Sequence, residues 1–138
     1  MLGFFSSSAI RILASGFAVF LYNGGRMRMI INNLLSPQDK QTIISGQNRT
    51  FPDVIDITDI SSIQKGLSSE GKHFFECLAW LIYNKRIDIK IVRPKDHNGI
   101  AHTKLGLFSD EKNKVSFEGS CNFTRAALVD NIESFSVS

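Results

Sequence analysis

The stretch Ala101–Ser134 reads AHTKLGLFSDEKNKVSFEGSCNFTRAALVDNIES and combines strand-like segments with chemically functional residues. Thr103–Phe108 is short and apolar, Asp110–Lys114 is polar, and Val115–Gly119 resumes the apolar pattern. This order predicts two antiparallel strands joined by a hairpin turn. Ile132–Val137 alternates between apolar and polar residues and predicts another strand.

Polar residues stand at the start of this predicted hairpin. His102 and Lys104 are two positions apart, so on a strand both side chains point to the same face. An imidazole beside an ammonium group suits a phosphodiester. Lys104 supplies positive charge to the non-bridging oxygens, and a ring nitrogen of His102 can attack phosphorus and later leave.

Further polar residues stand where the second strand ends and where the last one begins. Ser120 and Asn122 can both donate hydrogen bonds to phosphate oxygens. Glu133 is a candidate carboxylate for the second ring nitrogen of His102, where it would hold one tautomer. A His-x-Lys pair is also common on protein surfaces, so spacing alone leaves both interpretations open.

The chain before this stretch alternates between predicted helices and strands. Ser8–Tyr22 predicts a buried helix, ended by a glycine turn, and Arg26–Asn32 follows as a buried strand. A helix, a turn and a strand in this order form half of a β-α-β unit. Ser69–Arg86 is the strongest predicted helix, and Ile87–Arg93 alternates as a half-buried strand.

Other segments of this region carry weaker signals. Ser36 and Pro37 predict the start of a helix that runs to about Gly46. A short helix ending near Gly66 follows, with Thr58, Ser61 or Ser62 as its cap. Asn32 and Asn33 end a strand, where they could face a ligand or cap the loop. His73 is expected to be a surface or packing residue.

Size and composition set broad limits. With 138 residues the chain is one domain or part of one. The net charge of +3 fits a polyanionic partner and also many ordinary domains. The two cysteines, Cys77 and Cys121, form no C-x-x-C pair, which argues against zinc and against a disulfide framework. These features favour a cytoplasmic protein. The apolar Ser8–Tyr22 contains Arg11 and is too short for a membrane span.

The motif spacing resembles the phospholipase D superfamily, whose signature is H-x-K-x4-D followed by G-S-x-N. His102 and Lys104 match its first half, and Gly119, Ser120 and Asn122 match its second half. The resemblance implies an α/β fold with a mixed sheet flanked by helices on both faces. It makes His102, Lys104, Ser120, Asn122 and Glu133 the catalytic set.

One position departs from the family pattern. The family's aspartate would fall on Ser109, and Asp110 stands one residue later. In the family this residue is mostly structural, so Asp110 is expected beside the site or in the hairpin turn, with Gly119 as a second structural residue. Thr124, Arg125 and Arg93 are the expected contacts to substrate.

The resemblance implies a mechanism that needs no metal or cofactor. One histidine forms a phosphohistidine, and a histidine from a second motif copy protonates the leaving oxygen. This chain has one copy, because neither His73 nor His97 is followed by lysine two positions later. We therefore expect either a homodimer or a missing second half, with residues 1–138 as a single domain truncated at one or both ends.

The sequence around the motif most resembles the nuclease-like branch of the superfamily. This branch includes domains attached to bacterial and archaeal helicase or restriction proteins. We therefore expect a DNA endonuclease of restriction or defence type, without a membrane partner. Basic residues that would hold the DNA backbone are Arg26, Arg28, Lys90, Arg93, Lys95 and Arg125. Two alternatives remain open, a lipid phosphodiesterase or phosphatidyltransferase and a non-catalytic DNA-binding module. A metal site of Asp96, His97 and His102 is disfavoured, because so short a loop rarely presents three ligands.

Overall fold

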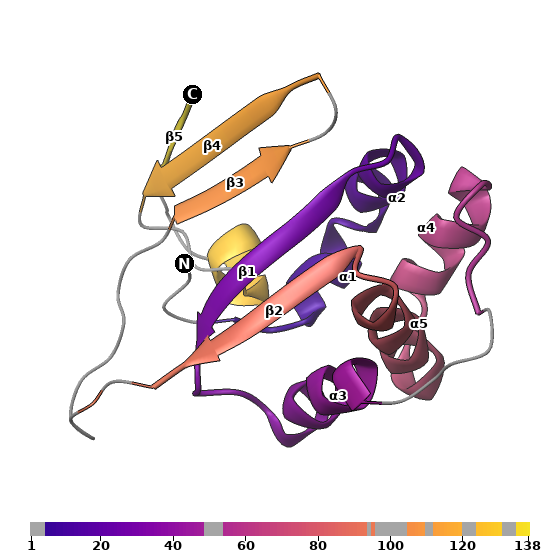
Figure 1. Cartoon of the computed structure of the whole chain (residues 1–138), viewed down its shortest axis with the longest axis horizontal. Coiled ribbons are helices and arrows are strands. Elements are labelled where there is room, and N and C mark those ends of the chain that lie inside the picture. The colour runs from indigo at the N-terminus through magenta and orange to yellow at the C-terminus, as the bar shows by residue number, and fades with distance from the viewer. Residues whose placement is uncertain are drawn as a thin grey trace.

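The strands form one mixed sheet (Figure 1). The computed structural model describes residues 5–48, 54–93, 95, 105–109, 112–119, 124–130 and 135–138. Within these ranges the sheet has five strands in the order β2-β1-β3-β4-β5. The strands are β1 (Arg26–Asn32), β2 (Ile87–Val92), β3 (Leu105–Ser109), β4 (Lys114–Gly119) and β5 (Phe135–Val137). β1 and β2 are parallel and the other pairs are antiparallel, which confirms the expected α/β class with a mixed sheet.

The helices largely follow the predicted positions. They are α1 (Ser8–Ile12), α2 (Ala14–Tyr22), α3 (Pro37–Asn48), α4 (Ile60–Ser68), α5 (Gly71–Tyr83) and a π-helical turn, η1 (Ala126–Asp130). The single helix predicted for residues 8–22 is wrong in one respect, because the backbone leaves helical values at Leu13 and divides it. No helix in the described ranges is long and apolar enough to cross a bilayer.

Two helix starts show how short-range polar contacts set the boundaries. Ser36 Oγ accepts a hydrogen bond from the Asp39 N–H at 3.1 Å, which confirms the predicted cap of α3. At α4 the predicted caps are wrong, because the Asp59 carboxylate accepts from the Ser61 N–H at 2.9 Å. An aspartate satisfies the free N–H groups as well as a hydroxyl does and adds favourable charge at the positive end of the helix.

The hydrophobic core lies between one face of β1 and β2 and the helices. Met27, Met29 and Ile31 of β1 are buried, as are Ile87 and Ile89 of β2. Register pairs Met27 with Ile87 and Met29 with Ile89, so these side chains form continuous apolar rows. Burying each such side chain contributes about 1.5–3 kcal/mol relative to leaving it in water.

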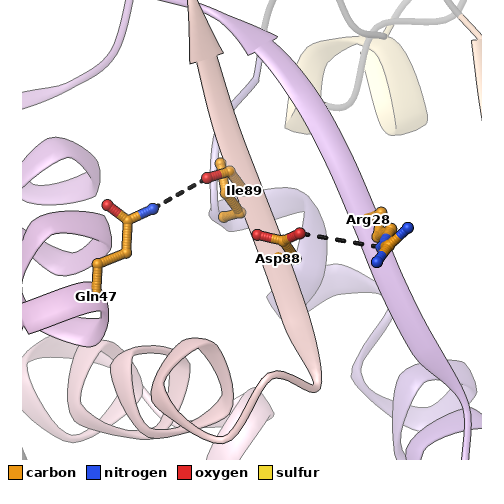
Figure 2. Close-up of polar contacts among 4 residues, drawn as sticks. All are labelled: Arg28, Gln47, Asp88 and Ile89. Atoms are coloured by element: carbon orange, nitrogen blue, oxygen red, sulfur yellow. Dashed lines mark hydrogen bonds and ion pairs between the residues drawn. The ribbon is translucent and has the colours of Figure 1, made fainter.

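The opposite face of β1 and β2 is not covered by any helix that the structure describes. Arg26, Arg28, Ile30 and Lys90 are exposed on it. Arg28 Nε lies 3.9 Å from Asp88 Oδ2 across the strand pair, as Figure 2 shows. The expectation of helices on both faces therefore fails for these two strands. A helix on this face would have to remove several charged side chains from water, which is unfavourable without compensating partners.

The free edge of the sheet at β2 is protected by a side chain of α3. Gln47 Nε2 donates a hydrogen bond to the Ile89 carbonyl oxygen at 3.1 Å (Figure 2). This contact satisfies one backbone group that an unpaired edge would otherwise offer to another chain. The same hydrogen bond connects α3 to β2. α3 also packs closely against α5.

Candidate functional site

Three strand ends converge at one end of the sheet. Leu105, which begins β3, lies opposite Glu118, one residue before the end of β4. Gly119, which ends β4, lies opposite Phe135, which begins β5. Antiparallel partners have Cα atoms roughly 4.5–5.5 Å apart. The start of β3, the end of β4 and the start of β5 are therefore neighbours.

The predicted catalytic residues are joined to these three strand ends by one to three peptide bonds. They themselves lie outside the described residues, and so does Asp110. The full set is His102 and Lys104 before β3, Ser120 and Asn122 after β4, and Glu133 before β5. Of the two predicted structural residues, Gly119 is described and closes β4.

The ends of β1 and β2 lie at the same end of the sheet. β1 is antiparallel to β3, with Met27 opposite Phe108, so β1 runs toward the start of β3. β2 is parallel to β1, with Asn32 level with Val92. Arg93 directly follows β2 and is exposed to solvent. A cationic side chain therefore stands at this end of the sheet; its role as a substrate contact stays a prediction.

Asn32 is the most informative described side chain at this end. It is only 3% exposed, and its Oδ1 accepts a hydrogen bond from the Leu34 N–H at 3.2 Å, so the predicted loop-capping role is confirmed. That bond assigns the amide orientation and leaves Nδ2 buried without a hydrogen-bond partner in the part of the chain that the structure describes. An unsatisfied buried donor costs roughly 1–3 kcal/mol, so such groups are rare in folded proteins.

In the sequence, the signal for Asn32 is weak and consists only of its place at the end of a buried strand. The structure raises its importance, because a buried amide donor without a partner stands at the end of the sheet where the predicted phosphate-binding residues are attached. The matching position Asn33 is exposed and carries no comparable feature. Asn32 is therefore added to the candidate site.

The predicted substrate contacts Thr124 and Arg125 directly precede the π-helical turn η1. Thr124 is half-buried, and its carbonyl oxygen accepts from the Leu128 N–H at 3.2 Å. Leu128 packs against the hydrophobic core, which anchors the turn, and Arg125 is exposed. The π-helical form of η1 is uncommon and occurs often at functional sites.

The cysteine–histidine pair on α5 has no features of a catalytic dyad. Cys77 Sγ lies 3.7 Å from His73 Nε2, and the thiol is fully buried. Burial, and secondarily the nearby Glu76 carboxylate, raises the pKa of Cys77 to about 11. The thiol is thus protonated at neutral pH and a poor nucleophile. His73 is exposed, as expected for a surface histidine.

Two further features of the described residues concern metal binding and a pocket. No group of three or more His, Cys, Asp or Glu side chains in those ranges could hold a metal ion. Asp96, His97 and His102, the disfavoured metal set, lie outside them. A pocket of about 310 Å³ between α3 and α5 is lined by Gln38, Gln41, Thr42, Ser45, Lys72, Phe75, Glu76 and Ala79. None of these belongs to the predicted catalytic set.

Comparison with known proteins adds no relative. A scan against protein-family models, a search of curated proteins and a search of solved structures each found no match. The motif residues and the arrangement of the strand ends are therefore the observations from which a function can be proposed.

Proposed function

We propose that this chain supplies half of a metal-independent phosphodiesterase site of the phospholipase D type, with DNA as substrate. The observation that supports it most is the convergence of the starts of β3 and β5 with the end of β4. The motif is divided among the three segments attached to these ends. A divided motif can act as one site only if its segments meet.

In the proposed reaction His102 acts as the nucleophile. Its ring nitrogen bonds to phosphorus while the bond to the leaving oxygen breaks, and the histidine of a second motif copy protonates that oxygen. Water then attacks the phosphohistidine and gives its proton to the second histidine, and the phosphorus–nitrogen bond breaks. Both histidines return to their starting states, so no net proton or electron is left over.

The other motif residues hold the phosphate and orient the nucleophile. Lys104, Ser120 and Asn122 would donate to the non-bridging oxygens, where charge develops in the transition state. Glu133 would accept from the second ring nitrogen of His102. The Asn32 Nδ2 group is a further donor of the right kind at the same end of the sheet.

The second histidine is proposed to come from another copy of the chain, which makes the active form a homodimer. A two-fold axis would bring two identical motifs together. We also propose that this domain forms one half of a phospholipase D/nuclease fold. Its proposed setting is a cytoplasmic restriction or helicase-associated protein.

DNA is favoured over a lipid substrate by charge. The chain carries a net charge of +3, and exposed basic side chains lie on the uncovered face of the sheet. Neutralisation of phosphates by such residues is the main source of non-specific affinity for DNA.

The test is cleavage of plasmid DNA in the presence of EDTA. The unaltered chain is expected to cut, and His102→Ala is expected to abolish cutting. His73→Ala is the matched control, because it removes an exposed histidine of α5 and should leave the rate unchanged. Activity that disappears in EDTA and returns with magnesium would contradict the mechanism. DNA binding without any cleavage would instead identify a non-catalytic module.

A chemical trap tests the intermediate separately. DNA labelled at the scissile phosphate, mixed with the protein and quenched with alkali, should leave label on His102, because phosphohistidine is stable to base. The same quench with His102→Ala should leave none. Label that survives in the His102→Ala protein would show that another group is the nucleophile.

A further inference from the structure

The uncovered face of the sheet carries a group of basic residues. Register places Arg26, Arg28 and Lys90 on one side of β1 and β2, because each alternates with a buried core residue. Ser109 of β3 pairs with both Arg26 and Lys114, so Lys114 lies in the same row on the same side. All four cations are exposed. We define this side as the open face.

Little on the open face neutralises these charges among the side chains that the structure describes. Asp88 lies beside Arg28, but the contact is 3.9 Å long, and the Arg28 side chain is 88% exposed. Such a pair contributes little and leaves both groups hydrated. Two apolar side chains, Ile30 and Leu107, are exposed on the same face, 42% and 55% respectively.

The charge pattern argues against a second copy as the occupant of this face. In a two-fold symmetric contact the same patch lies on both partners, so Arg26, Arg28, Lys90 and Lys114 would meet their own copies. Like charges placed against each other oppose association. A polyanion matches the face instead, and the apolar pair can contact the sugar and base surfaces between phosphates.

The open face also leads toward the candidate site. Arg26 and Lys114 lie at the far end of the sheet, and Lys90 pairs with Ile30, two residues before Asn32. Four residues of strand separate Arg26 from Ile30, which is roughly 13 Å. A nucleic acid backbone lying along the face would therefore pass from the hairpin end to the strand ends that carry the motif.

We infer that the open face binds the DNA backbone on one side of the cleavage site. This inference rests on the proposed function for its ligand, but it concerns binding and not the chemical step. Arg26, Arg28, Lys90 and Lys114 would contact phosphates without reading bases, so affinity is expected to depend on salt and not on sequence.

The experiment measures binding of a fluorescein-labelled DNA duplex by anisotropy at several salt concentrations. The full chain carries His102→Ala, so that no cutting occurs. The test variant combines Arg26→Gln, Arg28→Gln and Lys90→Gln. The control combines Lys40→Gln, Lys65→Gln and Lys72→Gln, which remove the same charge from exposed positions on α3, α4 and α5.

The open-face variant should raise Kd about tenfold or more and lower the salt slope by about 3, whereas the control should change Kd by less than about twofold. Asp88→Asn should tighten binding, because it removes a negative charge from the same face. Circular dichroism and thermal unfolding check that the variants fold. The six substituted lysine and arginine side chains are exposed, so these charge changes are expected to leave folding unaffected.

Three results would overturn the inference. In the first, both triple variants weaken DNA binding equally. In the second, the open-face variant does not weaken DNA binding. In the third, the open-face variant changes the mass of the protein in solution and leaves its DNA affinity unchanged, which would identify a protein contact. Its failure is separable from failure of the proposed function. A chain that binds DNA through the open face but never cuts contradicts only the chemistry. A chain that cuts without the open face contradicts only this inference.

Discussion

Leu105 and Glu118 are register partners, although thirteen positions separate them in the chain. This pairing puts the first residue of β3 beside the end of β4. The segment that carries His102 and Lys104 and the segment that carries Ser120 and Asn122 are therefore attached to neighbouring backbone positions. Without this pairing the two parts of the motif would be separate stretches of sequence with no reason to act together.

The homodimer can be tested by mixing subunits. If each site needs a His102 from both copies, adding an equal amount of His102→Ala chain and allowing exchange should lower DNA cleavage to about half, since only about a quarter of the dimers then carry both histidines. A chain that works alone should show no change on mixing. Light scattering measures the mass of the same samples and shows whether dimers are present.

Asn32→Ala should reduce activity more than stability. The change removes the bond to Leu34, worth about 0.5–1.5 kcal/mol, but it also removes a buried donor for which the described residues supply no partner. The two effects oppose each other, so the free energy of unfolding, measured in urea, should change by less than about 1 kcal/mol. If Nδ2 binds phosphate, kcat/KM for DNA cleavage should fall about tenfold or more.

Asn33→Ala is the matched control for that experiment. Asn33 is the next residue and is exposed, so its removal should affect neither quantity. Unchanged cleavage by Asn32→Ala, together with a clear loss of stability, would show that the amide serves only the loop.

Gly46 and Gly16 should respond to alanine in opposite directions. A Cβ on Gly46 would lie 2.7 Å from Ile82 Cβ and 2.8 Å from the Ala79 carbonyl oxygen, so Gly46→Ala must separate α3 from α5. We expect a loss of about 1–3 kcal/mol in the free energy of unfolding. Gly16 lies exposed in α2 with nothing within 4 Å of a new Cβ, so Gly16→Ala should gain about 0.5–1 kcal/mol.

Chemical denaturation of both glycine variants measures directly whether each substitution raises or lowers the free energy of unfolding. If Gly46→Ala were neutral, the close contact of α3 with α5 would not be a constraint in solution.

The raised pKa of Cys77 predicts a loss of stability in alkali. The thiol has an ordinary pKa of 9.0 and a pKa of about 11 in the folded chain. Below pH 9.0 both states keep the proton, so Cys77 causes no pH dependence. Between the two values the unfolded chain releases the proton and the folded chain keeps it, so the free energy of unfolding falls as pH rises.

Cys77→Ala should lack this part of the alkaline decline, whatever its effect at neutral pH. Urea unfolding of both proteins below pH 9.0 and near pH 11 measures the difference in slope. Parallel curves for the two proteins would show that the thiol titrates normally, and hence that α5 admits water around Cys77.

Most secondary-structure elements could be predicted from the sequence, because their signals are local. The alternation of Ile87 and Ile89 with Asp88 and Lys90 predicted β2, and the Ser36–Pro37 start predicted α3. The motif residues could be named for the same reason, since residue type and spacing are visible in one dimension. The local exceptions, the break at Leu13 and the Asp59 cap, lie where several residues compete for one boundary.

By itself the sequence determined most of the segments that are helices or strands and which side of each is apolar, and it supplied the residues that are proposed to perform phosphodiester chemistry. Only the tertiary structure decided the strand order, the face of β1 and β2 that no described helix covers, and the burial of the Asn32 Nδ2 donor without a partner among the described residues. Periodicity records which face of a strand avoids water, but not which element covers it. Pairings such as Leu105 with Glu118 depend on contacts between distant segments, and these form only when the whole chain packs.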